Sequence, residues 1–142
     1  MVIVMRQRTC CFTGHRKIDT KLYTSIMSKL IDTIEYLVKN GYCYFGAGGA
    51  LGFDTMAAQA VLQLREKYPQ VKLILVLPCL SQANSWSTED KEIYESIKKN
   101  ADKVVYTSKD YTKGCMFKRN RHLVDGSSAC ICYLKESTGG TA

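Results

Sequence analysis

A glycine-rich turn at residues 46–54, with the sequence GAGGALGFD, has the clearest potential to bind a ligand. Glycines let backbone amides approach an anion closely, and the segment after the turn has the apolar spacing of a helix, whose N-terminus attracts negative charge. Gly48, Gly49 and Gly52 are therefore candidate contacts to a phosphate or a ribose. The alternative is a tight strand-to-helix turn without a ligand, and the spacing is not that of the GxGxxG fingerprint.

Asp54 ends this turn, and three roles suit it. Aspartate is a favoured N-cap, so the residue would begin the helix that follows. Its carboxylate would equally accept hydrogen bonds from ribose hydroxyls, or act as an acidic group on a sugar carbon. Asp54 is the candidate catalytic residue, and the three roles stay open.

Polar and basic residues follow the first expected strand, at Thr13, Gly14, His15 and Arg16. A guanidinium at this point would meet a phosphate, because arginine pairs with phosphate through two parallel hydrogen bonds. The alternative is an exposed loop that leads into the next helix.

Arg119 and Asn120 interrupt the inner face of a late helix, whose apolar residues at spacings of three and four are Cys115, Met116, Leu123 and Val124. A buried charge is costly unless it is paired. We therefore expect Arg119 to point toward an anion or a carboxylate. The two candidate partners are Asp125 and a bound phosphate.

The loop after the third expected strand holds Gln82 and Trp86, the only tryptophan of the chain. A nucleobase would stack on an indole ring. A lone tryptophan in a loop more often plugs the space beneath that loop, and these residues alone favour the plug.

Continuous apolar runs alternate with amphipathic segments along the whole chain. The expected strands are 8–14, 42–46, 71–78, 103–107 and 129–134, and the expected helices are 19–39, 55–68, 88–100 and 115–125. Strict alternation predicts an α/β fold, a single Rossmann-like three-layer domain over residues 1–142 with a mostly parallel five-stranded sheet and helices on both faces. The N-terminal MVIVM is either an extra edge strand or a frayed end.

The candidate residues all lie in the segments that follow the strands, some directly after a strand and Arg119 and Asn120 further on, in the next helix. Ligands of open parallel sheets bind beyond the carboxyl ends of the strands, so we expect these residues to meet at one edge of the sheet.

The bulk composition favours a globular protein with an anionic partner. The 142 residues are 46% hydrophobic with a formal net charge of +7, and no run approaches the roughly 20 apolar residues of a membrane span. We expect a cytoplasmic protein without a membrane partner. The seven cysteines fit reduced thiols, and although Cys130 and Cys132 point to one face of a strand, their spacing does not support a metal site.

Four segments together resemble the YpsA-like family of the SLOG superfamily: CCFTGHR, GGALGFD, LPCLSQANSW and KRNRHLVDGSSACICYLKESTGGT. This superfamily also holds the Lonely Guy phosphoribohydrolases and the DNA-processing protein DprA. The resemblance, over residues 8–141, implies a Rossmann-like fold and a nucleotide or nucleotide-derived ligand, with no required cofactor. It assigns phosphate or ribose contacts to Gly48, Gly49, Gly52, Asp54, Gly139, Gly140 and Thr141, and it places Thr13, Gly14, Arg16, Gln82, Trp86, Arg119 and Asn120 around the same pocket.

Two departures from the related families shape the expectation. Lonely Guy enzymes carry a glutamate just beyond their Gly-Gly-x-Gly-Thr segment, and here the sequence reaches Ala142 without one. YpsA-like proteins continue into a helix at this point, so a missing C-terminal helix is expected to leave apolar sheet surface exposed and to favour a homo-oligomer.

Three functions follow as hypotheses. The first is a nucleotide-binding protein that acts as a sensor. The second is a hydrolase of nucleotide N-glycosidic bonds, with Asp54 as the acidic residue and Arg16 and Arg119 holding phosphate. The third, a single-stranded nucleic-acid binder, rests on the net charge and on the analogy with DprA, and it is the weaker partner prediction because the basic residues are not regularly interleaved with aromatics.

Overall fold

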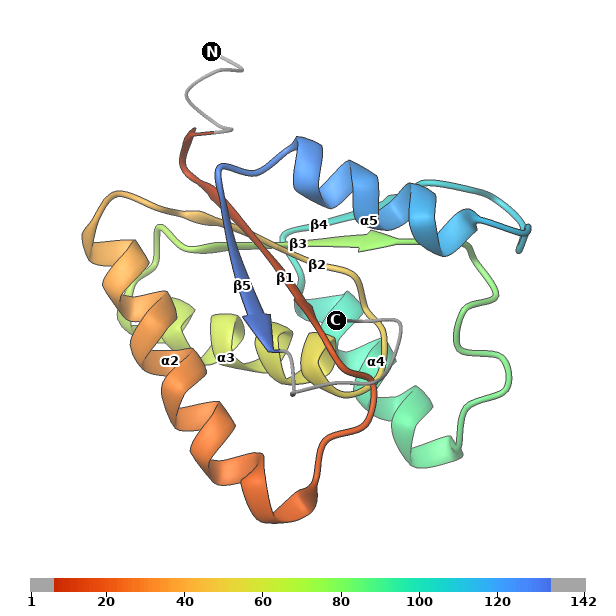
Figure 1. The fold of residues 1–142 in the computed structure, drawn as a ribbon, viewed down its shortest axis with the longest axis horizontal. Helices are drawn as coiled ribbons and strands as arrows, with labels where there is room; N and C mark the ends of the chain where they lie inside the picture. Colours follow the sequence, from red (N-terminus) through yellow and green to blue (C-terminus); the bar gives the residue numbers. More distant parts are fainter. Residues whose placement is uncertain (1–6, 134–142) are drawn as a thin grey trace.

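The computed structural model describes residues 7–133, and within them strands and helices alternate as the sequence predicts (Figure 1). The strands are β1 (Thr9–Gly14), β2 (Tyr44–Ala47), β3 (Lys72–Leu77), β4 (Lys103–Tyr106) and β5 (Ala129–Tyr133). The helices are the short 3-10 turn η1 (Thr20–Leu22), α2 (Tyr23–Lys39), α3 (Phe53–Lys67), α4 (Thr88–Asn100) and α5 (Cys115–Asp125). The N-terminal MVIVM and the segment with Gly139, Gly140 and Thr141 lie outside the described residues.

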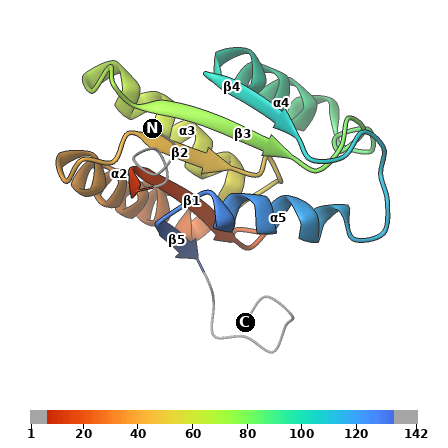
Figure 2. The same ribbon diagram turned by 90° about the horizontal axis from the view of Figure 1, so that it is seen from above.

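The five strands form one parallel sheet in the order β4-β3-β2-β1-β5. From β1 to β4 the chain moves steadily in one direction, and right-handed crossovers then place α2, α3 and α4 on the same face. The return from β4 to β5 runs the opposite way, which puts α5 on the other face (Figures 1 and 2). The fold is therefore three-layered, and its topological switch point lies between β1 and β5.

The main core lies between the sheet and helices α2 to α4. Helix α2 buries one residue per turn, at Ile26, Leu30, Ile34 and Val38, against strand side chains such as Phe45 and Leu73. A smaller cluster of Cys11, Val76 and Leu123 lies under α5. The apolar strands are thus covered on both faces, as parallel strands require.

Helix starts follow the expected capping chemistry. Asp19 accepts a hydrogen bond from the Lys21 amide and begins η1, and Ser87 accepts one from the Asp90 amide and begins α4. Helix α3 differs from the expectation, because it begins at Phe53 after Gly52, two residues earlier than predicted.

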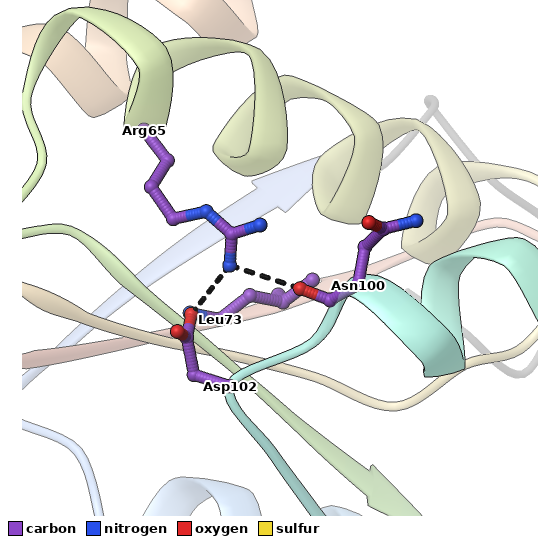
Figure 3. A network of polar contacts seen from close by, with 4 residues as sticks. All are labelled: Arg65, Leu73, Asn100 and Asp102. Carbon is purple, nitrogen blue, oxygen red and sulfur yellow. Dashed lines mark hydrogen bonds and ion pairs between the residues drawn. The ribbon is translucent and has the colours of Figure 1, made fainter.

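A polar network fastens the amino-terminal side of the sheet (Figure 3). Arg65 of α3 donates to the Asn100 carbonyl oxygen at 2.9 Å and to Asp102 Oδ2 at 2.7 Å. The same carboxylate oxygen accepts the Leu73 amide at 2.8 Å. The network joins α3 and the end of α4 to the starts of β3 and β4. The network lies at the amino-terminal ends of the strands, whereas the candidate site lies at their carboxyl ends. It helps to position the elements but contributes no residue to the site.

Candidate functional site

A polar cavity of about 700 Å³ lies beyond the carboxyl end of β1, next to the switch point. The loop after β1, the glycine-rich turn and α5 converge on it. Its lining residues are Phe12, Thr13, Gly14, His15, Arg16, Lys17, Ala50, Asp54, Met116, Arg119 and Asn120. Three of these carry a positive charge and one a negative charge, so the cavity favours an anion.

Arg119 forms the floor of this cavity and is only 4% exposed. Its Nη1 donates to the Gly48 carbonyl oxygen and its Nε donates to Asn120 Oδ1 at 2.7 Å. Neither acceptor is charged, and no carboxylate among the described residues forms an ion pair with Arg119. Burial lowers the pKa of Arg119, against the opposing effect of the Asp54 charge.

Asp125, one of the two partners predicted for Arg119, pairs instead with Arg121. Arg121 Nε and Asp125 Oδ2 are 3.8 Å apart on the exposed side of α5. The helical spacing explains this pairing, because residues four apart share a face, whereas Arg119 points under the helix. The alternative of a bound anion remains a prediction.

Asp54 lies in the first turn of α3 but is not its N-cap, which is Gly52. The N-cap role considered for Asp54 is therefore wrong. The carboxylate turns back and accepts the Ala50 amide at 3.3 Å. Burial raises the pKa of Asp54 to about 6, while the positive charges of Arg119 and Arg16 and the Ala50 hydrogen bond act in the opposite direction. A carboxyl group with this pKa exchanges protons near neutral pH.

The three glycines of the turn each have a packing reason within the chain. Gly49 and Gly52 have φ values of 74° and 79°, a region that side chains strain. A Cβ atom at Gly48 would lie 2.5 Å from Arg119 Nη1, and one at Gly52 would meet the Arg16 carbonyl oxygen. The tight turn thus explains the glycines without a ligand, and their contact with phosphate stays a prediction.

The turn is also joined directly to the loop after β1. The Phe53 amide at the start of α3 donates to the His15 carbonyl oxygen at 3.0 Å. Gly14 packs so closely on the Phe53 ring that a Cβ atom there would lie 2.6 Å from it. The two loops that line the cavity therefore hold each other in place.

A second, more apolar cavity of about 570 Å³ adjoins the first on the side of α3 and α4. It shares Arg16, Lys17 and Asp54 with the polar cavity. Its other lining residues include Ile18, Tyr23, Gly49, Gly52, Trp86, Ile93 and Tyr94. The two cavities therefore lie side by side, and Asp54 lines both.

Trp86 is half-buried and stacks edge-on against Tyr94, with ring centroids 5.0 Å apart. It packs against the main core, which fits the predicted plug, and it also forms part of the cavity wall. Gln82 lies behind this wall, where its Nε2 is 3.4 Å from both the Gly49 carbonyl oxygen and the Tyr94 hydroxyl. Gln82 supports the turn and lines neither cavity.

The sequence did not single out Lys17 and Tyr94 as site residues. Lys17 follows the predicted Arg16 directly, so the basic pair was a usable signal. Tyr94 occupies a buried position of α4, and nothing in its spacing separates a cavity wall from ordinary core. The described part of the chain holds no group of three or more His, Cys, Asp or Glu side chains placed to bind a metal ion. Within residues 7–133, no helix has both the length and the apolar character needed to cross a bilayer.

A three-layer parallel α/β domain whose polar residues gather at the switch point belongs to the Rossmann-like class. The sequence profile of the YspA SLOG family matches residues 10–142, and the chain belongs to that family. One relative is the uncharacterized SPbeta prophage-derived protein YoqJ of Bacillus subtilis (strain 168), 30% identical over 129 residues that cover 82% of this chain and 75% of YoqJ. Another is a UPF0398 protein of Bacillus pumilus (strain SAFR-032), 31% identical over 130 residues that cover 90% of this chain and 70% of the relative.

Among solved structures, the chain is similar to DNA processing protein A from Helicobacter pylori, described for its single-stranded DNA binding mode. The superposition has a TM-score of 0.62 with 19% sequence identity and covers 98% of this chain and 59% of that chain. At this identity the likeness shows the shared fold.

Proposed function

We propose that the protein binds a nucleotide or a nucleotide derivative across the two adjoining cavities. The observation that carries the proposal is the buried guanidinium of Arg119, which faces a polar cavity without a carboxylate partner among the described residues. A buried charge of this kind is stabilised by an anion of the opposite sign.

In this proposal the phosphate occupies the polar cavity. Arg16, Lys17 and Arg119 supply the positive charge, and arginine suits the planar geometry of phosphate oxygens. The start of α3 lies beside this cavity, and the positive end of the helix dipole favours a phosphate there. Gly139, Gly140 and Thr141, which the family resemblance assigns to the same site, remain predicted contacts.

The base is proposed to lie in the apolar cavity, against Trp86 and Tyr94. A flat ring fits between aromatic and aliphatic walls, and stacking is favourable for any base. The ribose then passes Asp54, where the two cavities join, and its hydroxyls would donate to the carboxylate. This arrangement accounts for one charged and one apolar compartment in a single site.

The test is a thermal-shift series with AMP, ADP, NAD, ADP-ribose, GTP and cyclic nucleotides. A ligand at one hundred times its Kd should stabilise the fold by about 2.7 kcal/mol. Arg119→Gln should abolish the shift, while Arg121→Gln, an exposed arginine on the same helix, should retain it. Flat curves with every ligand for the unaltered protein would refute the proposal. The same incubations, analysed for released base, separate a binding protein from a hydrolase of N-glycosidic bonds.

A second candidate, binding of single-stranded nucleic acid, is favoured by the outer surface of α5. Phe117 is 70% exposed there, and Tyr111 just before the helix is 66% exposed. Lys118 and Arg121 are exposed beside Phe117, and such a mixture of aromatic and basic side chains suits stacked bases and phosphates. Phe117→Ala should weaken binding of a labelled oligothymidine, whereas Tyr36→Ala, which removes an equally exposed ring on α2, should not. An affinity that does not fall with salt would argue against this function.

A further inference from the structure

The seven cysteines divide into five buried thiols and two exposed ones, Cys130 and Cys132. The two exposed thiols lie on β5, which is an edge strand of the sheet (Figure 2). Alternate residues of a strand point to the same face. The sulfur atoms of Cys130 and Cys132 are accordingly only 3.7 Å apart. Among residues 7–133, helix α5 packs mainly against β3, and Cys130 and Cys132 are exposed.

A third thiol, Cys11, contacts this pair from the neighbouring strand. Cys11 is the register partner of Cys130 and is buried. The neighbouring Cys130 and Ser127 side chains lower the pKa of Cys11 to about 7, while burial acts in the opposite direction. The same contact with Cys11 raises the pKa of Cys130. Cys11 is therefore a third thiol beside Cys130 and a competing partner for a disulfide.

We propose that Cys130 and Cys132 are a redox modification site, which a hydroperoxide converts into a disulfide within β5. The site is separate from the two cavities and does not depend on their ligand. Its effect on ligand binding rests on the proposed function.

The chemistry balances in two steps. The Cys132 sulfur attacks one peroxide oxygen and the O–O bond breaks, which forms a sulfenic acid. The leaving oxygen takes up the thiol proton of Cys132, so that hydrogen peroxide releases a first water. The Cys130 sulfur then attacks the Cys132 sulfur, the S–O bond breaks, and the leaving hydroxide takes up the proton of Cys130, which releases a second water. Two electrons pass from the two thiols to the peroxide.

Closure has a geometric cost along the strand. Residues two apart in a strand are separated by about 6.6 Å between Cα atoms, at the upper end of the range of roughly 4.4–6.8 Å that disulfides span. The strand must shorten locally to bring the sulfurs to bonding distance. A disulfide closed under this distortion is readily reduced, so the modification is reversible.

The distortion falls next to the proposed binding site. Cys132 is the register partner of Thr13, and Tyr133 is that of Gly14, and both Thr13 and Gly14 line the polar cavity. Movement of β5 therefore alters the loop that carries Arg16. If this movement removes one hydrogen bond between the loop and the nucleotide, the nucleotide should bind about fivefold more weakly.

Peptide mass mapping tests the modification without any ligand. Trypsin cleavage after Arg121 and Lys135 leaves both cysteines in one peptide, 122–135. Hydrogen peroxide should lower the mass of this peptide by two hydrogens, and dithiothreitol should restore it. The variants Cys130→Ser and Cys132→Ser should each lose the response, while Cys43→Ser, which removes a buried thiol, should keep it.

Two results would overturn the proposal: an unchanged peptide 122–135 after peroxide treatment, or a cross-link from this peptide to the one that contains Cys11. The effect on binding is measured separately, for the reduced and the oxidised protein, as the Kd of whichever nucleotide gives the largest thermal shift in the series from AMP to the cyclic nucleotides. If the reduced protein binds no nucleotide, the proposed function fails and the mass result still decides the modification. Equal Kd values in both states would overturn the link to the site.

Discussion

At the scale of single residues, the site depends on two charged groups of opposite sign, and both are buried at a cost in stability. Arg119 is buried with neutral acceptors, and Asp54 is a carboxyl whose environment resists ionisation. Each would be better accommodated by a partner: an anion beside Arg119, or a proton on Asp54. These costs are typical of a binding site, because groups that serve a ligand are left incompletely satisfied without it.

Asp54 makes stability depend on pH in a direction opposite to that of most carboxylates. Burial raises its pKa from the ordinary 3.8 to about 6. Between these values the folded protein holds a proton that the unfolded chain has released, so the free energy of unfolding falls as pH rises through this window. Asp54→Asn keeps an acceptor for the Ala50 amide and removes the titration. The variant should be more stable than the parent at pH 7 by up to about 3 kcal/mol, with the difference vanishing below pH 4. Urea unfolding at both pH values measures this, and a difference independent of pH would contradict it.

Gly48 leaves room for the Arg119 guanidinium, which packs directly against it. A Cβ atom there would lie 2.5 Å from Arg119 Nη1, and the flexible side chain would move away and lose its hydrogen bond to the Gly48 carbonyl oxygen. Gly48→Ala should therefore cost about 1 kcal/mol of stability and should weaken nucleotide binding. Gly126→Ala is the matched control, because the nearest atom to its Cβ would be 3.4 Å away. Equal nucleotide affinity in the two variants, measured by calorimetry, would show that the Arg119 position is unimportant for binding.

At the scale of elements, the sequence predicted the strands and helices well because their signals are local. The apolar run of β3 and the four-residue stripe of α2 each identify an element without reference to the rest of the chain. The contact between Arg119 and Gly48 joins residues 71 positions apart, and no local pattern encodes it. The true N-cap of α3, Gly52, was missed for a similar reason. Its φ of 79° and the Arg16 carbonyl oxygen, which leaves no room for a Cβ atom, both depend on how the two loops pack together.

A variant at Asp102 tests whether nucleotide binding depends on the amino-terminal ends of the strands. Its carboxylate accepts from Leu73 and Arg65, and although burial acts in the opposite direction, these partners lower the pKa of Asp102. The stabilisation is therefore present at neutral pH and is lost as pH falls below the ordinary value of 3.8. Asp102→Ala should destabilise the fold by about 1–2 kcal/mol at pH 7, because the Leu73 amide loses its acceptor. Chemical unfolding measures the loss. Nucleotide affinity should stay unchanged. A loss of affinity in Asp102→Ala would mean that a change at the amino-terminal ends of the strands alters the site at their carboxyl ends.

At the scale of the whole molecule, the strand order explains why one site has two unlike compartments. On one face of the sheet, residues of α2, α3 and α4 line the apolar cavity. On the other face, α5 supplies Arg119 to the polar cavity. The compartments join at the carboxyl edge, at Asp54 and the basic pair Arg16 and Lys17. The alternation of elements predicted this edge as the site, whereas the division into compartments follows from the strand order, which local patterns do not reveal.

A ligand that spans both compartments should respond to changes in either, and its fragments should respond to only one. Trp86→Ala should weaken binding of AMP and adenosine by about 1–3 kcal/mol, the usual contribution of a stacked base, and should leave ribose 5-phosphate unaffected. Arg119→Gln should weaken AMP and ribose 5-phosphate and leave adenosine unaffected, since adenosine carries no phosphate. Calorimetric titration of the three ligands against the two variants measures all six affinities. If both variants weaken all three ligands equally, the cavities do not divide the ligand between them. AMP should also bind more tightly than either fragment, because joining the parts makes the second contact intramolecular.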